Sequence, residues 1–463
     1  MWLSRRQASV FAFVMAGLAQ PGVARAEVEL AKVGGWTVTT EGRVNGFVSH
    51  VWGDSRPEGL EGLNWVGFDE NTSTNEVNAE GKLRTTKIRS GYLPSVLAFN
   101  VRNKLSETFT LSGHVEIGLQ IANIQPSFVA NPTWMDPRSV YADLAGSWGS
   151  VRAGRDFGFF SRGNLFMNYE LGHGYGLGFP CAYLTMYGGA CGHVGFGTLW
   201  PDFHAQISYS TPWLGDVVQV SAGIFDPRSI ETKNWFLMPW PRFEGEAVAK
   251  YNWKEGWGLK AWANGAFQTV GIGYDPRDPV TNEIIGAREE RFQNAYGYGG
   301  GIQGYMGPFK VGVSGYGGRG LDAFEFLSFN PIIVGRANQL PDGMGGTISV
   351  QPQDVVLRTS KGFLVHAMFS LGPAWVMGGF GQALLDRIPE DGPLELPNTA
   401  MIRTQTGISA GVFYRIANAV IGLDYFNAHY GFDPLNTGTL EAPVFVDIEQ
   451  RIHVVNSGVT VEW

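Results

Sequence analysis

The chain has 463 residues, of which 44% are hydrophobic, 13% aromatic and only 16% charged, and its net charge is −8 at pH 7. This acidic balance argues against a nucleic-acid partner, because proteins that bind nucleic acids carry basic surfaces. Beyond the first 26 residues there is no run of about 18 apolar residues, the length that a membrane-spanning helix needs. If this chain enters a membrane, we therefore expect it to do so with strands.

The first 26 residues have the three parts of a secretory signal peptide. Arg5 and Arg6 are basic, residues 8–19 are apolar, and the segment ends on the small residues Ala24 and Ala26. We expect residues 1–26 to be a signal peptide, and residues 27–463 to form one barrel domain, because no linker divides them. Cleavage would remove three arginines and no acid, which changes the net charge from −8 to about −11.

Alternation of polar and apolar residues begins at about residues 36–52 and continues through the chain in short segments. In the stretch 108–121, Phe109, Leu111 and Val115 alternate with Thr110 and Ser112. This period of two predicts a strand with one apolar and one polar face. A soluble sheet would show the same pattern, so the order of turns and loops carries the argument further.

Seven pairs of such segments meet at short turns, which predict hairpins. These turns are centred on 103–106, 148–150, 213–216, 254–256, 306–308, 372–373 and 415–418. Eight longer stretches separate them: 53–83, 123–138, 157–200, 227–242, 270–294, 318–361, 383–404 and 428–451. With one strand before the first loop and one after the last, the count is sixteen. An even number of strands with short turns on one side and long loops on the other predicts an all-β fold, a 16-stranded antiparallel transmembrane β-barrel.

The third long loop is rich in glycine and aromatic residues and carries the only two cysteines, Cys181 and Cys191. In the oxidising periplasm we expect this pair to form a disulfide. Two free thiols are the alternative. A redox pair is disfavoured, because nothing resembles a C-x-x-C motif on a helix.

Several segments resemble Gram-negative general diffusion porins. Residues 97–120 (LAFNVRNKLSETFTLSGHVEIGLQ) are similar to the second porin hairpin. Residues 139–164 (SVYADLAGSWGSVRAGRDFGFFSRGN) are similar to the strand that ends in Gly-Arg before the long third loop. The chain ends in SGVTVEW, and its last residue, Trp463, is similar to the aromatic signal read by the barrel-assembly machinery.

This resemblance implies a homotrimer in the bacterial outer membrane that interacts with its lipids and lets small hydrophilic solutes and ions diffuse through. It also implies short periplasmic turns, long extracellular loops and a third loop folded into the lumen, where opposed charges form a constriction with a transverse electric field. The candidate constriction residues are Arg43, Arg84, Lys87, Arg102, Arg152, Asp156 and Glu170. Any one of them could instead be an ordinary solvated charge. Arg43 is the best placed, because it shares a polar strand face with Thr39 and Asn45, whereas Pro94 makes the register of the second strand uncertain.

Arg155 poses a separate problem, because alternation places it on the outward face with Val151 and Ala153. An arginine exposed to lipid near the middle of the bilayer costs roughly 2–4 kcal/mol. We therefore expect Arg155 to lie in a subunit interface. A local bulge that turns its side chain into the lumen is the alternative.

Other motifs carry less weight. Residues 407–411 fit G-x-S-x-G around Ser409, but the motif lies in a strand that leads to a hairpin, which disfavours an outer-membrane hydrolase. The G-x-G-x-x-G at 299–304 precedes no helix, and the eight histidines lack metal-binding spacing, so no cofactor or metal is expected. His114 and His204 are expected to line the lumen.

A substrate-specific sugar or nutrient channel remains an alternative, and its candidate stacking aromatics are Phe157, Phe159, Phe160, Tyr175, Phe179, Tyr183 and Tyr187.

Overall fold

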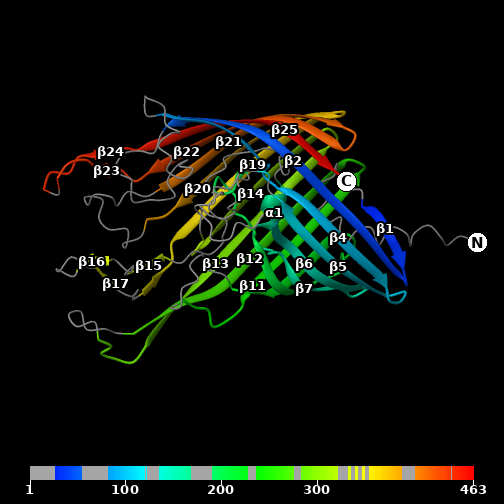
Figure 1. Ribbon diagram of the computed structural model, residues 1–463, viewed down its shortest axis with the longest axis horizontal. Helices are drawn as coiled ribbons and strands as arrows, with labels where there is room; N and C mark the ends of the chain where they lie inside the picture. The colour runs from blue at the N-terminus through cyan, green and yellow to red at the C-terminus, as the bar shows by residue number, and fades with distance from the viewer. Residues whose placement is uncertain are drawn as a thin grey trace, which may run out of the picture.

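The computed structural model describes residues 27–54, 82–119, 121, 135–167, 190–227, 236–275, 283–321, 332–334, 339–341, 347–349, 354–387, 402–439 and 441–463. In this part of the chain, sixteen antiparallel strands close into one barrel (Figure 1). Each barrel strand pairs with the next along the chain, and the first, β2, pairs with the last, β25. The predicted fold is therefore confirmed.

The barrel strands are β2 (Trp36–Asp54), β3 (Lys82–Arg89) with β4 (Ser95–Lys104), β5 (Phe109–Leu119), β6 (Met135–Gly146), β7 (Gly149–Phe157), β8 (Phe203–Ser210), β9 (Val218–Phe225), β11 (Arg242–Lys254), β12 (Trp257–Tyr274), β13 (Glu289–Met306), β14 (Phe309–Arg319), β19 (Thr359–Leu371), β20 (Ala374–Leu385), β21 (Ile402–Ile416), β22 (Ala419–Phe432) and β25 (Glu449–Glu462). Shorter elements are β1 (Val28–Val33), β10 (Phe236–Leu237), β15 (Ile332–Val334), β16 (Gln339–Pro341), β17 (Thr347–Ser349), β18 (Asp354–Val356), β23 (Leu435–Asn436), β24 (Phe445–Val446) and the helix α1 (Arg162–Phe166). Among the described residues, no helix has the length and apolar character that a membrane span requires.

All seven predicted hairpin turns are confirmed, and they lie at the end of the barrel where β1 and the C-terminus lie (Figure 1). The long connections lie at the other end. One of them is shorter than predicted, because β12 continues to Tyr274 and β13 begins at Glu289. Cross-strand pairing is unbroken up to this pair of residues, so the hairpin extends past the point where the alternation of side chains weakens.

The strand β1 was not predicted. It turns back at Gly34 and Gly35, both with positive φ, and pairs with residues 36–40 of β2. It lies on the same edge of β2 that β25 covers further along, between Arg43 and Gly53. The short segment VELAKV shows little alternation, but pairing with this otherwise uncovered edge stabilises it.

The second barrel strand is interrupted between β3 and β4. Phe47 of β2 pairs with Arg89, whereas Arg43 pairs with Val96, so the register shifts by three residues across Pro94. Because this shift is odd, odd-numbered residues face inward in β3 and even-numbered residues face inward in β4. Asn45 stabilises the interruption: its Nδ2 donates to Leu93 O at 2.7 Å, and its Oδ1 accepts from Gly91 N at 3.1 Å.

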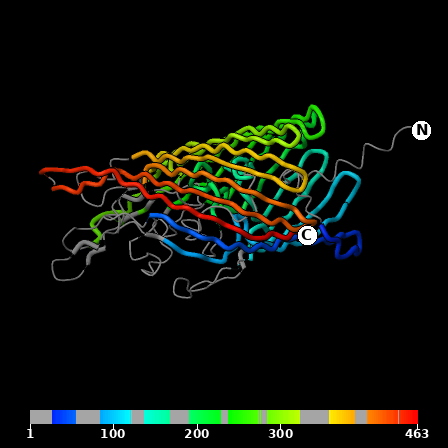
Figure 2. The backbone as a smooth tube through the Cα atoms, turned by 90° about the horizontal axis from the view of Figure 1, so that it is seen from above, coloured from blue at the N-terminus to red at the C-terminus, as the bar shows by residue number. Residues whose placement is uncertain are grey.

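The interior of the barrel contains an apolar core as well as polar side chains. Inward-facing residues of β2, β20, β21, β22 and β25 pack against Tyr92, Leu93 and the end of the third loop. The other members of this core include Val51, Leu385, Phe426, Tyr430, Phe432, Ile452 and Val454. Figure 2 shows blue β2 and green β12–β14 on opposite sides of the barrel, with a teal segment between them. The described arms of the third loop therefore pack against the inner wall and take up part of the interior.

Candidate functional site

The third loop, residues 158–202, is described over 158–167 and 190–202, and its first arm is held by β11. Glu244 Oε2 accepts the backbone N–H groups of Phe159 and, at 2.9 Å, of Phe160. Arg242 forms an ion pair with Glu244, and Arg162 of the loop pairs with Glu246. A carboxylate that accepts two backbone donors fixes the path of the chain at the point where it leaves the wall.

The short helix α1 follows and packs against β12–β14. Asn164 bridges two strands: its Oδ1 accepts from Trp262 Nε1 at 2.7 Å, and its Nδ2 donates to Gly315 O at 3.0 Å. Glycines on the wall make room for the loop, since a Cβ at Gly297 would lie 2.5 Å from the ring of Phe160. The inward small residues of β13, which include part of the G-x-G-x-x-G motif, are thus explained by packing.

The second arm lies on the opposite part of the wall. The imidazole of His193 lies in a notch formed by Gly379 and Gly407, where a Cβ would come within 2.9 and 2.8 Å of the ring. Its Nδ1 contacts Phe196 O at 3.2 Å, and its Nε2 contacts the Oγ of Ser409 at 3.3 Å. Because the carbonyl oxygen only accepts, Nδ1 carries the proton and Nε2 accepts from the serine hydroxyl.

Burial lowers the pKa of His193 well below its ordinary value, and the neighbouring His366, with its ring centre 5.9 Å away, acts in the same direction. The neutral imidazole is the form that fits the notch.

Carboxylates gather on the lumen face of β2 and β5–β7, in what we call the acidic row. Its members are Glu41, Glu116, Asp143 and Asp156, and all four lie within electrostatic range of His114 or Tyr141. Arg152 is the cation among them: it binds Asp143 through Nε at 3.0 Å and Nη2 at 2.7 Å, and it also pairs with Asp156. The guanidinium lies 3.7 Å from the ring centre of Tyr141. Within this row one arginine faces four carboxylates; two further arginines on the same face, Arg43 of β2 and Arg138 of β6, are each only 5% exposed.

A basic cluster lies around α1 and β11–β12. It consists of Arg162, Lys250 and Lys260: Lys260 is within electrostatic range of the other two and of Glu246, and Arg162 pairs with Glu246. Lys250 Nζ also lies over the ring of Trp213, 3.8 Å from its centre. This side of the lumen is positive. Charges of opposite sign on different parts of one wall are the arrangement that creates a transverse field in a narrow lumen.

Two candidate constriction residues, Arg152 and Asp156, are brought together as an ion pair. Arg43 faces the lumen side but is only 5% exposed, because its Nε and Nη2 both donate to Pro94 O, at 3.2 and 3.1 Å. Arg102 faces inward near the short-turn end of β4, where it lies 3.7 Å from Glu27. Lys87 faces inward opposite Ser49.

The structure contradicts the prediction that Arg84 lines the lumen. It pairs with Trp52 on the outward face of β2, so it does not line the lumen. The odd register shift at Pro94 is the physical reason, because it places Lys87 and Arg102 on the same face although their numbers differ in parity. Glu170 lies outside the described residues.

The structure describes only one of the two cysteines. Cys191 is disulfide-bonded and fully buried in the apolar core, whereas Cys181 lies outside the described residues. The pairing of the two stays a prediction.

Sequence reasoning missed the residues that anchor the loop, namely Glu244, Glu246 and Arg162, and it also missed Lys260 of the basic cluster. Their signal was present, since Glu244 and Glu246 alternate with apolar Phe243 and Ala247 along one strand. Carboxylates at two successive inward positions of a strand indicate that the inner wall binds another segment there. The alternation of polar and apolar residues along the strand does not show which segment that is. In the described part of the chain, no cluster of three or more potential metal ligands occurs.

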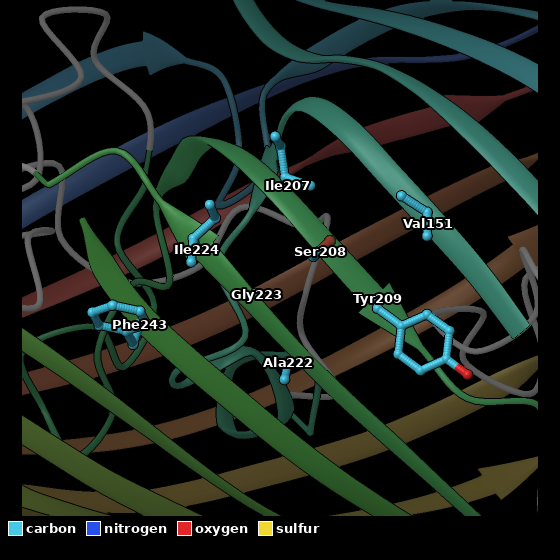
Figure 3. A pocket seen from close by; sticks show the side chains of 8 residues that line it. All are labelled: Val151, Ile207, Ser208, Tyr209, Ala222, Gly223, Ile224 and Phe243. Atoms are coloured by element: carbon cyan, nitrogen blue, oxygen red, sulfur yellow. The ribbon is translucent and has the colours of Figure 1, made fainter.

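The outer face is apolar with shallow hollows. One of them lies over β7–β9 and β11 and is lined by Val151, Ile207, Ser208, Tyr209, Ala222, Gly223, Ile224 and Phe243 (Figure 3). Arg155 lies on this face, paired with Val140 and Ala205, as alternation predicted. No register shift occurs among the described pairs of β6, β7 and β8 near it, so they contain no bulge that turns Arg155 inward.

Residues 9–437 match the sequence profile of Gram-negative porins. The chain belongs to this family. Its fold is similar to that of the outer-membrane channel DcaP of Acinetobacter baumannii, with a TM-score of 0.56 and 11% sequence identity over 93% of this chain and 99% of that one. It is also similar to the anion-selective porin of Comamonas acidovorans, with a TM-score of 0.55 and 13% identity over 92% of this chain and 100% of that one. No curated protein matches the sequence. This porin is therefore an outer-membrane channel through which solutes diffuse.

Proposed function

We propose that this porin is a weakly selective passive channel for small hydrophilic solutes and ions. The observation that carries the proposal is the third loop, whose described arms are fixed to the inner wall, the first at β11–β14 and the second at β20 and β21. The described first arm, held by Glu244, Glu246 and Asn164, lies inside the barrel and narrows the lumen. Charged walls of both signs favour hydrated polar solutes over apolar ones.

A planar-bilayer recording in a salt gradient tests the proposal. We expect unit conductance steps, a reversal potential that Lys260→Gln shifts toward cation preference, and a shift of opposite sign for Glu116→Gln. Lys361→Gln serves as the control, because Lys361 faces outward on β19 and should leave the potential unchanged. If neither inward substitution moves the reversal potential, the acidic row and the basic cluster do not form the constriction.

Two alternatives receive less support. For a substrate-specific channel, Phe159 and Phe160 would have to offer stacking surfaces, but both are buried, against Phe225 and Gly297 respectively. Tyr175, Phe179, Tyr183 and Tyr187 lie outside the described residues. For a hydrolase, Ser409 contacts His193 but is only 4% exposed inside β21, where a substrate cannot reach it.

We further propose that the mature chain begins near Glu27, after cleavage by a signal peptidase, and that Cys181 and Cys191 form the disulfide of the third loop. Closing so short a loop stabilises by about 2–3 kcal/mol in the chain-entropy model. Intact-mass measurement of the exported protein, with alkylation before reduction, checks both proposals.

The proposed assembly is a homotrimer in outer-membrane lipid, inserted by the barrel-assembly machinery, with Arg155 in the subunit interface. The half-buried Arg155 and the hollows on the outer face of β4–β11 support this arrangement. A semi-native gel that retains a species of three times the monomer mass would support it, and a monomer under all mild conditions would contradict it.

A further inference from the structure

Two lysines face each other across neighbouring strands near the short-turn end of the lumen. Lys250 of β11 pairs directly with Lys260 of β12, and the alternation along both strands points the two side chains inward. The Cβ atoms of such a pair lie about 5 Å apart, and like charges directly opposite each other destabilise a sheet. Each of these lysines therefore needs a compensating interaction.

Lys250 finds its compensation within the protein. Asp216, in the turn between β8 and β9, lies within electrostatic range of its ammonium group. The ring of Trp213, in the same turn, also contacts this group, with Nζ 3.8 Å from the ring centre. The face of an indole ring attracts a cation at this distance.

The turn between β8 and β9 is shaped to hold Trp213 against the end of β11. Gly215 and Asp216 both adopt a positive φ, of 59° and 60°, which folds the turn back on itself. The backbone N–H of Lys250 donates to Val217 O at 2.8 Å and so joins the turn to β11. The position of the Lys250 ammonium group thus depends on Trp213.

Lys260 has no comparable compensation. In the described part of the chain its ammonium group makes no hydrogen bond and no ion pair. The carboxylate that acts on it electrostatically is Glu246, which is already paired with Arg162 of the third loop. Arg162 and Lys250 both repel it. Because the Lys260 side chain is half-buried on the inner wall, a solute in the lumen can reach it.

Other hydrogen-bond donors surround Lys260 on three elements. Lys250 flanks it on β11, and Gln303 flanks it on β13. Arg162 lies within electrostatic range from α1, inside the barrel. The amide of Gln303 is half-buried and makes no hydrogen bond in the described ranges. A tetrahedral oxyanion can accept hydrogen bonds from several directions at once, whereas the two oxygens of a carboxylate lie in one plane.

We propose that the basic cluster and Gln303 form a saturable binding site for a dianionic phosphate group at the short-turn end of the lumen. This inference rests on the proposed function as a passive channel and deepens it. A doubly negative group supplies the charge that the opposed lysines lack, and its oxygens accept from the ammonium, guanidinium and amide donors. Lys260 binds the solute directly. Trp213 is a positioning residue, which acts through Lys250.

Planar-bilayer recording of the purified porin in KCl tests the proposal with three probes at a pH of about 8. Glycerol 2-phosphate is mostly dianionic there, and we expect it to reduce the current along a saturable curve. Inorganic phosphate should saturate at a similar concentration, because the site contacts the phosphate group itself. Diethyl phosphate carries one charge and should bind at least about tenfold more weakly. Equal effects of the diester and the monoester, or no effect of inorganic phosphate, would overturn the proposal.

Lys260→Gln should weaken the binding of glycerol 2-phosphate about tenfold, the loss of one charge-assisted hydrogen bond. Lys310→Gln is the matched control, because Lys310 is also a half-buried inward lysine but lies on β14, two strands away, and does not act on Lys260. It should bind the monoester as the parent does. Equal weakening by the two substitutions would assign the effect to the general charge of the lumen and overturn the site.

Trp213→Leu should weaken binding about threefold, whereas Trp213→Phe, which keeps an aromatic face, should restore it. If the two Trp213 variants bind alike, Trp213 does not position Lys250. Heat-modifiable migration on a gel confirms that each variant is folded. Absence of conductance steps in KCl alone would contradict the proposed function, whereas steps without a saturable effect of glycerol 2-phosphate would overturn this inference and leave the channel intact.

Discussion

The indole of Trp463, the last residue of the chain, packs on Gly42 of the first barrel strand. A Cβ at Gly42 would collide with Cζ2 of the indole, and the two backbones exchange hydrogen bonds of 2.9 and 3.1 Å. The end of the chain is thus fixed on the first strand at the seam where the barrel closes.

We expect Gly42→Ala to impair closure of the barrel, because the added methyl group displaces the indole. Overpacking of this kind costs about 1–3 kcal/mol. The fraction of heat-modifiable folded barrel after refolding measures the effect. Gly245→Ala is the control, since a Cβ at the outward-facing Gly245 has only Ser221 O nearby, at 3.6 Å. Equal yields of the two variants would show that the contact between Gly42 and Trp463 is dispensable.

Deletion of Trp463 should lower the amount of assembled protein in the outer membrane and leave the conductance of the surviving channels unchanged. Trp463 faces outward on the β25 side of the seam, away from the lumen, so its loss alters pairing and recognition by the assembly machinery. Quantitative blotting of outer-membrane fractions and single-channel recording measure the two effects separately. Normal levels of the truncated protein would count against an assembly signal at this position.

The strand order of the barrel follows from the sequence, because turns and alternation are local properties. The arrangement of side chains in the interior of the barrel does not follow from the sequence in the same way. The shift at Pro94 changes which residues face the lumen, and a single odd shift moves Arg84 from wall to outer surface. The contacts of Glu244 with Phe159 and of His193 with Ser409 join segments 85 and 216 residues apart, which no local pattern specifies.

Arg43 and Lys260 should behave differently although both face the lumen. Arg43 donates twice to Pro94 O, so Arg43→Gln leaves that carbonyl without its partner and should lower the free energy of unfolding by about 1–3 kcal/mol. Its effect on ion selectivity should be small, because its side chain is almost fully buried. Lys260→Gln should shift selectivity with little loss of stability. Urea unfolding and reversal potentials distinguish the two, and the opposite pattern would place Arg43 in the constriction.

The docking of the second loop arm should weaken as the pH falls below about 6.5. The folded pKa of His193 is depressed, so the unfolded chain binds more protons between that depressed value and 6.5. Stability is therefore complete above 6.5 and decreases as the pH falls through this window. Among the described residues, His366 of β19, Ser409 of β21 and Phe426 of β22 contact the imidazole, and these three side chains carry no negative charge that would stabilise its protonated form.

Thermal unfolding of the parent at pH 7.5 and pH 5 measures this dependence. In His193→Phe the difference between the two temperatures should shrink, whereas in His50→Phe, on the outer surface, it should persist. An unchanged pH dependence in His193→Phe would assign the acid sensitivity to other groups.

Arg155 should stabilise the association of subunits. It lies on the outward face of β7 between Val140 and Ala205, about five residues above the periplasmic turn, a depth still within the apolar band at ~3.3 Å per residue. Its Nε is buried and has no hydrogen-bond partner among the described residues, and exposure of an arginine to lipid at that depth costs roughly 2–4 kcal/mol. An acidic group or carbonyl of a neighbouring subunit would supply the missing acceptor.

We expect Arg155→Ala to lower the temperature at which trimers dissociate on a semi-native gel and to leave the reversal potential unchanged. The control is Lys361→Ala, which removes another outward base and should change neither quantity. Stable trimers with altered ion selectivity would show that the guanidinium reaches the lumen instead.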